Sequence, residues 1–167
     1  MKIELKKVES DEISAMCQVA EKAWHISYDQ LLPPGQVDYM VERFQSPKAV
    51  KEQINQENYV YYMVLADGTP KGFAGFAPWY QGQEEMFLSK VYLLPEVQGQ
   101  GAAGKMFRLV ESEAQRQGLS AIRLTVNKQN AHAIEVYQHY GFKIIDSVVT
   151  DIGEGYVMDD YIMLKKI

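Results

Sequence analysis

The chain has 167 residues, 47% of them hydrophobic and 23% charged, which predicts a single globular domain over residues 1–167. The net charge of −5 argues against a nucleic-acid binder, and the single cysteine, Cys17, excludes an intrachain disulfide and suits a reducing compartment. No apolar run reaches the length of a signal peptide or of a membrane span, so we expect a cytoplasmic protein without a membrane partner.

The N-terminal third is predicted to hold one strand and three helices. Residues 2–7 alternate polar and apolar side chains, as an opening strand does. Ser10 is a candidate N-cap for a first helix that ends near residues 26–32. A second helical pattern follows the Pro33-Pro34-Gly35 break, and Ser46-Pro47 predicts the start of a short third helix that reaches about Asn55.

The remaining chain alternates strands and helices. Residues 59–66 and 71–78 flank the turn pair Asp67-Gly68, which predicts a hairpin. Further strands are expected at about 85–94, 120–126, 142–150 and 156–165, with helices at about 101–117 and 130–140. Because hairpins and crossover connections both occur, we expect an α/β fold with a mixed sheet.

The most informative segment joins the strand at 85–94 to the helix at 101–117. It reads Gln98-Gly99-Gln100-Gly101-Ala102-Ala103-Gly104-Lys105. Glycines let the backbone approach a ligand closely, and the N-terminus of a helix offers free N–H groups and the positive end of its dipole. The combination indicates a phosphate or pyrophosphate site, although a plain tight turn uses the same residues.

Two nucleotide-binding motifs fit this segment superficially. Three glycines from Gly99 onward have the spacing of the dinucleotide fingerprint, but the next strand ends near Asn127 and offers no acidic residue for a ribose. Gly99 to Lys105 also has the spacing of a P-loop, but Met106 stands where Ser or Thr would bind magnesium. A nucleotide-binding enzyme stays open as a minor alternative.

A third register of the same segment is Gln98-x-x-Gly101-x-Ala103, which follows a strand that ends in an apolar-Pro-Glu turn. It resembles the first signature of the GNAT superfamily of N-acetyltransferases. The later series Asn127, Asn130-x-x-Ala133, Tyr137 and Gly141-Phe142 resembles the second signature. The two signatures occur in the expected order, and with the strand order they cover most of residues 59–142. The tail at 155–165 looks most like the bacterial polyamine acetyltransferases.

The resemblance implies a GNAT-like α/β fold, with a mixed, mostly antiparallel twisted sheet of about seven strands flanked by helices. It also implies an enzyme that moves an acetyl group from acetyl-CoA to a primary amine by direct attack in a ternary complex, without a metal. A polyamine or another small amine is the favoured acceptor. The alternatives are a protein N-terminus or lysine as acceptor, and a catalytically silent CoA-binding module. Exposed edge strands would allow a homodimer.

The resemblance also assigns roles to individual residues. The backbone of Val91, Tyr92 and Leu93 would run along the pantetheine arm, and an N–H group there could polarise the thioester carbonyl. The N–H groups of Gln98, Gly99, Gln100, Gly101, Ala102, Ala103, Gly104 and Lys105 would hold the pyrophosphate. Asn127 and Asn130 would contact the pantetheine or nearby CoA atoms. Tyr137 would hydrogen-bond the sulfur and protonate the departing thiolate.

Trp24 and Tyr28 lie in the helical region that usually covers the acceptor site in this family, which makes them candidate substrate-binding residues. Trp24 fits a core anchor equally well. His25, His132 and His139 show no metal-ligand spacing with Cys17, which is expected to be a buried small hydrophobe.

The general base is left open by the sequence. An attacking amine must lose a proton, because a free alkylamine has a pKa near 10. Many relatives use a glutamate on the motif strand, but Phe87 and Ser89 stand where that carboxylate would be. Glu84 and Glu85, acting through water, and a bare water chain are the alternatives. The Asp159-Asp160 pair either attracts a cationic acceptor or forms a solvated strand end.

Overall fold

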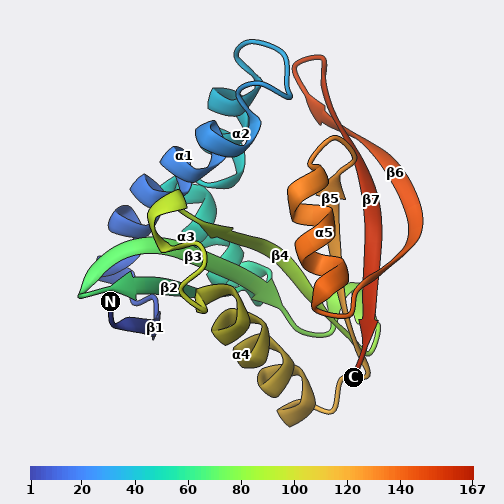
Figure 1. Ribbon diagram of the computed structural model, residues 1–167. Coiled ribbons are helices and arrows are strands. Elements are labelled where there is room, and N and C mark those ends of the chain that lie inside the picture. Colours follow the sequence, from blue (N-terminus) through green and yellow to red (C-terminus); the bar gives the residue numbers. More distant parts are fainter. The chain divides into compact units, whose positions relative to one another are not determined.

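The computed structural model describes every residue from Met1 to Ile167. Seven strands form one sheet in the order β1-β2-β3-β4-β5-β7-β6 (Figure 1). The β4–β5 pair is parallel, whereas β1–β2, β2–β3, β5–β7 and β6–β7 are antiparallel. The expected α/β fold with a mostly antiparallel sheet is therefore confirmed.

Each predicted element is present, with ends shifted by a few residues at most. The elements are β1 (Ile3–Lys7), α1 (Ile13–Tyr28), α2 (Gln36–Phe44), α3 (Pro47–Gln56), β2 (Val60–Ala66), β3 (Thr69–Ala77), β4 (Glu85–Leu93), α4 (Ala102–Arg116), β5 (Ala121–Asn127), α5 (Ala131–His139), β6 (Lys143–Gly153) and β7 (Tyr156–Lys166). None of these helices combines the length and apolar character that crossing a membrane would need.

The chain divides into two compact units. Residues 1–77 and 88–110 make the first unit, and residues 78–87 and 111–167 make the second. Strand β4 and helix α4 each contribute to both. The candidate site has parts in each unit. The end of β4, the glycine turn and the first turns of α4 belong to the first unit, whereas the residues of the second signature belong to the second unit.

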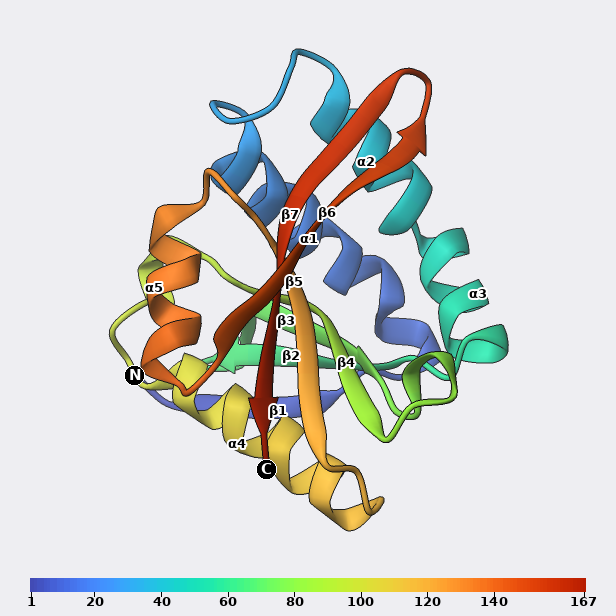
Figure 2. The ribbon, with the colours of Figure 1, turned by 90° about the vertical axis from the view of Figure 1, so that its right-hand side faces the viewer.

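The first unit is built around the β2–β3 hairpin. Asp67 and Gly68 both have positive φ, 49° and 81°, as a two-residue hairpin turn with matching twist requires. Side chains alternate between the two faces of these strands. Tyr61 and Phe73 pack with α1 and α3 on one face, whereas Ala74 packs with the first turns of α4 on the other. Figures 1 and 2 show these helices on opposite sides of β2 and β3.

The predicted cap at Ser10 is wrong. Ser10 to Glu12 form a short 3-10 turn ahead of α1, and Glu12 organises it. One carboxylate oxygen of Glu12 accepts the Glu9 N–H at 3.1 Å, and the other accepts the Lys6 ammonium at 2.6 Å. The residue at the N-cap position of α1 is therefore Glu12, and an acidic side chain holds the turn ahead of the helix. The predicted cap of the third helix is confirmed, because Ser46 Oγ accepts the Ala49 N–H at 3.2 Å.

The second unit centres on the antiparallel strands β5, β7 and β6. Asn127, the last residue of β5, lies opposite Asp160 of β7. The beginning of β4 pairs with β5 over Glu85 to Phe87. The β6–β7 hairpin is the longest feature of this unit, and Figure 2 shows α5 alongside it.

Candidate active site

A glycine turn leads from β4 into α4. After a 3-10 turn at Pro95–Val97, Gly99 and Gly101 adopt positive φ of 79° and 80°. No atom lies within 4 Å of a Cβ built at either glycine, so there is space for a side chain. Glycine is favoured at both positions because of the positive φ. Helix α4 then begins at Ala102, and the N–H groups of its first turn have no partner within the helix. Such a helix start is suited to binding an anion.

Internal hydrogen bonds narrow the predicted pyrophosphate donors. The Gln98 N–H donates to the Pro95 carbonyl at 3.2 Å, and the Lys105 N–H donates to the Gly101 carbonyl at 3.2 Å. The Lys105 ammonium donates to the Ile3 carbonyl at 3.1 Å. The backbone N–H groups of Gln98 and Lys105 are therefore already hydrogen-bonded to other residues of the protein. The N–H groups of residues 99–104 are the ones left to bind a ligand.

The end of β4 is held closely against β3. The Leu94 N–H donates to the Lys71 carbonyl at 2.9 Å. Gly72 lies beneath this segment, and a Cβ added there would meet Leu93 Cδ2 at 2.7 Å and the Tyr92 carbonyl oxygen at 2.8 Å. The backbone predicted to run along the pantetheine arm thus owes its position to a residue without a side chain.

We expect Gly72→Ala to raise the KM for acetyl-CoA by about tenfold, because the new methyl displaces the Tyr92–Leu93 backbone. The matched control is Gly75→Ala, whose methyl would meet the Tyr61 ring at 2.5 Å. Both variants should unfold at lower temperature, but only Gly72→Ala should change the KM. Steady-state kinetics and thermal unfolding separate the two effects, and equal KM values for both variants would contradict the role predicted for the end of β4.

Four aromatic side chains meet in the first unit, with Tyr92 at their centre. The Tyr28 and Tyr92 hydroxyls share a hydrogen bond of 2.6 Å, and the Tyr92 ring lies 5.9 Å from the Trp24 ring and 5.7 Å from that of Phe73. Trp24 and Tyr28, the two residues predicted to bind the acceptor amine, therefore both contact Tyr92 of β4. Trp24 and Tyr28 are only 4% and 5% exposed, so both also serve the core.

The second signature forms a strand end, a turn and a helix start. Asn127 Oδ1 accepts the Gln129 N–H at 2.8 Å. Asn130 Oδ1 accepts the Ala133 N–H at 3.3 Å, so Asn130 is the N-cap of α5. The oxygen of each asparagine side chain therefore shapes the backbone, and the amide N–H groups are the part with which each would contact CoA.

Tyr137 is a half-buried residue of α5. Its ring packs edge-on against Phe142 with centroids 6.0 Å apart, and the Phe142 N–H donates to the Tyr137 carbonyl at 3.0 Å. Gly141, with a φ of 97°, makes the reversal that brings Phe142 back to the helix. The Gly-Phe pair that closes the signature therefore fixes the ring of Tyr137.

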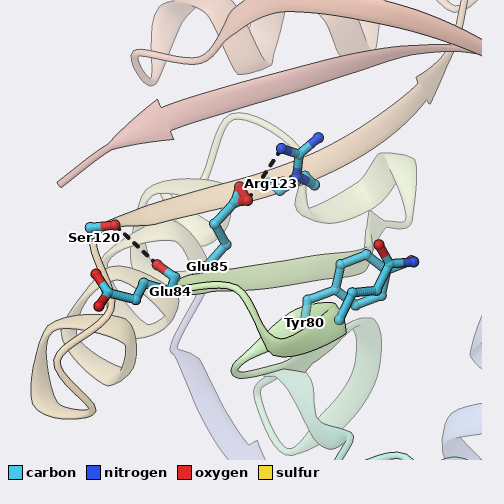
Figure 3. A network of polar contacts seen from close by, with 6 residues as sticks. Tyr80, Glu84, Glu85, Ser120 and Arg123 are labelled. Carbon is cyan, nitrogen blue, oxygen red and sulfur yellow. Dashed lines mark hydrogen bonds and ion pairs between the residues drawn. The ribbon is translucent and has the colours of Figure 1, made fainter.

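Glu85 is committed to an ion pair. Arg123 of β5 donates from Nε and Nη2 to the two Glu85 oxygens at 3.0 and 3.2 Å (Figure 3). Ser120 donates to the backbone carbonyl of Glu84 at 3.1 Å. At Phe87, the ring packs on Tyr80 with centroids 4.2 Å apart. Both carboxylate oxygens of Glu85 are therefore engaged by a single guanidinium group.

Sequence reasoning missed a buried polar cluster around Lys90 of β4. The Lys90 ammonium donates to the Phe44 carbonyl at 3.0 Å, to Gln53 Oε1 at 3.1 Å and to the Tyr61 hydroxyl at 2.5 Å. Burial lowers the pKa of Lys90 to about 7, and burial also raises the pKa of Cys17 to about 11. The expected burial of Cys17 is confirmed. The available signal was that Lys90 alternates with the apolar Leu88 and Met86 along one strand face.

Comparison with known proteins decides the family. The model of the acetyltransferase (GNAT) family matches residues 21–142, a range that contains both signatures. The chain belongs to the GNAT family. It is therefore an acyltransferase that depends on acetyl-CoA, and the glycine segment needs neither nucleotide-binding interpretation.

The relatives of this GNAT protein are N-acetyltransferases, and the name of one of them gives its acceptor. A spermidine N(1)-acetyltransferase of Thermoplasma acidophilum is 22% identical over 167 residues, which cover 99% of this chain and 98% of the relative. The N-acetyltransferase YjgM of Escherichia coli is 30% identical over 93 residues, so the chain spans 56% of its length. The crystal structure of PaiA N-acetyltransferase from T. acidophilum, in complex with coenzyme A, superposes with a TM-score of 0.84 at 24% identity over the whole of both chains.

Proposed function

We propose that this GNAT protein acetylates the primary amine of a small molecule, with a polyamine as the favoured acceptor. The observation that carries the proposal is the second signature, in which an Asn130-capped helix fixes a half-buried Tyr137. The similarity to a spermidine acetyltransferase along nearly the full chain supports the acceptor class. A net charge of −5 favours a cationic substrate over an anionic one.

Each group has a proposed part in the reaction. The N–H groups of residues 99–104 would bind the CoA pyrophosphate at the start of α4, and the backbone of Val91 to Leu93 would align the pantetheine arm. The amine nitrogen would attack the thioester carbon directly. As the C–S bond breaks, the Tyr137 hydroxyl would give its proton to the sulfur. Trp24 and Tyr28 would shape the region that receives the acceptor.

We expect Ala103→Glu to weaken acetyl-CoA binding about tenfold to a hundredfold, because it places a carboxylate beside the proposed pyrophosphate. The same carboxylate in the first turn of α4 favours the helix dipole, so the variant should fold normally. Acetyl-pantetheine, which has no pyrophosphate, is the matched donor. Titration calorimetry should show weaker CoA binding, while turnover of acetyl-pantetheine should stay unchanged. A similar loss with both donors would contradict this placement of the pyrophosphate.

The deciding experiment for the function is thiol release from acetyl-CoA in the presence of separate amines. Spermidine and spermine represent the favoured class, and amino acids, aminoglycosides and short peptides represent the others. Turnover on the polyamines alone supports the proposal. Turnover on peptides alone would assign the protein-acetyltransferase alternative, and tight CoA binding without turnover of any amine would assign the silent CoA-binding module.

A further inference from the structure

Asp160 of β7 is a buried acid without a role in the reaction outlined above. Asp160 is 8% exposed, and its Oδ1 atom is buried without a hydrogen-bond partner. The preceding acid, Asp159, is instead exposed and pairs with Lys128 at 3.0 Å. Burying a carboxylate oxygen without a hydrogen-bond donor costs free energy, because the oxygen loses its hydrogen bonds to water and no protein group replaces them. A ligand that donates a hydrogen bond to Oδ1 would remove this cost.

The position of Asp160 connects it with the second signature. Asp160 lies directly opposite Asn127 across the β5–β7 pair and opposite Val148 across the β6–β7 pair. Residues directly opposite each other in a sheet project from the same face. The carboxyl therefore lies beside the Asn127 side chain, where β5 ends and the chain turns toward Asn130 and α5. On the other side of Asp160, its neighbour on β6 is the apolar Val148.

We propose that Asp160 is the general base that accepts a proton from the acceptor ammonium, an inference that rests on the proposed amine acetylation. The ammonium gives one proton to the Asp160 carboxylate and becomes a neutral amine. The nitrogen lone pair forms the new bond to the thioester carbon while the C–S bond breaks. Tyr137 protonates the sulfur and takes up the second proton lost by the nitrogen, and Asp160 releases its proton to water.

The local electrostatics suit this task. Burial raises the pKa of Asp160 to about 6, the negative charge of Asp159 adds to the rise, and Lys128 opposes it. A base works best when its pKa lies near the working pH, and an ordinary aspartate is too weak a base at pH 7. Asp160 is still ionised at pH 7, so it can accept a proton. An ammonium would also supply the donor that its Oδ1 lacks.

The test compares Asp160→Asn with the matched control Asp159→Asn, using the wild type's best amine across pH 6–9.5. For Asp160→Asn we expect kcat/KM for the amine to fall by about a hundredfold at pH 7. The loss should shrink as the pH rises, because solution then supplies more neutral amine. In the wild type, kcat/KM should fall as the pH drops below about 6, where Asp160 becomes protonated. This fall should be absent from the pH profile of Asp160→Asn. Asp159→Asn should keep activity within about threefold and move the fall seen in the wild type to lower pH, since it removes the charge that raises the pKa of Asp160.

A weakly basic amine, already neutral at pH 7, provides the sharpest comparison. Asp160→Asn should acetylate it nearly as well as the wild type does, because no proton needs removal before attack. An equal loss on this amine would overturn the proposal. A raised KM for the ordinary amine with an unchanged pH profile would also overturn it, and would make Asp160 an anchor for the cation.

Stability measurements check that these effects do not come from misfolding. The pKa of Asp160 is higher in the folded protein than the ~3.9 of an unfolded chain, so its contribution favours the folded state at low pH and is lost as the pH rises through about 6. Asp160→Asn should therefore unfold at pH 7 at the same or a higher temperature than the wild type. If it unfolds earlier, Asp160→Ser is measured in its place. A wild type that acetylates no amine overturns the proposed function, whereas an active wild type with an equally active Asp160→Asn overturns only the base.

Discussion

Tyr137→Phe should lower kcat by about 10²–10³-fold while the KM for acetyl-CoA stays nearly constant, because a general acid typically contributes this much to rate. Phenylalanine keeps the edge-on packing against Phe142, so α5 should hold its position. The departing thiolate loses its proton donor. Thiol release under saturating acetyl-CoA and amine measures the effect directly.

Two comparisons isolate the hydroxyl of Tyr137. Tyr140→Phe removes the hydroxyl from the neighbouring tyrosine at the end of the same helix, and it should retain kcat within about twofold. A thioester donor with a more acidic thiol needs less help from an acid, so Tyr137→Phe should lose less activity with that donor. An undiminished kcat with acetyl-CoA would leave the family assignment in place and remove Tyr137 from the role of general acid.

Lys90→Ala should lower the free energy of unfolding by about 3 kcal/mol, because it opens a cavity and takes the shared donor away from Phe44, Gln53 and Tyr61. In a protein of this size that loss corresponds to about 6–12 °C in Tm. Lys90→Met fills the space without the charge and should lose less than half as much. Lys51→Ala removes an exposed lysine from α3 and should be nearly neutral.

The pH dependence of unfolding tests the charge state of Lys90. Burial lowers the pKa of Lys90 to about 7 in the folded protein, against about 10.4 in an unfolded chain. The unfolded state therefore binds more protons between these values, and stability rises with pH. Between pH 7 and pH 9 the wild type should gain about 2 kcal/mol more than Lys90→Met does, at about 1.4 kcal/mol for each pH unit. Equal pH slopes would show that Lys90 is fully charged in the folded protein.

The sequence determined the elements and both signatures. The Asp67-Gly68 turn, the Ser46 and Asn130 caps and the glycine turn at residues 99–101 all follow from local preferences of backbone and side chain. These preferences act over a few residues, so they can be predicted without a tertiary structure. The predicted cap at Ser10 is wrong because a later residue, Glu12, organises that turn by accepting hydrogen bonds from the Glu9 N–H and from the Lys6 ammonium.

Tertiary structure decided which acids and bases are available for chemistry. Adjacent residues Asp159 and Asp160 look alike in the sequence, but the pleat sends one to solvent and buries the other beside Asn127. Glu85 is paired with Arg123, which lies on a different strand and cannot be identified as its partner from the sequence. Burial and charge pairing depend on residues far apart in the chain, and these two quantities set a pKa. The sequence alone could therefore identify the family, whereas the candidate base emerged only from the folded protein.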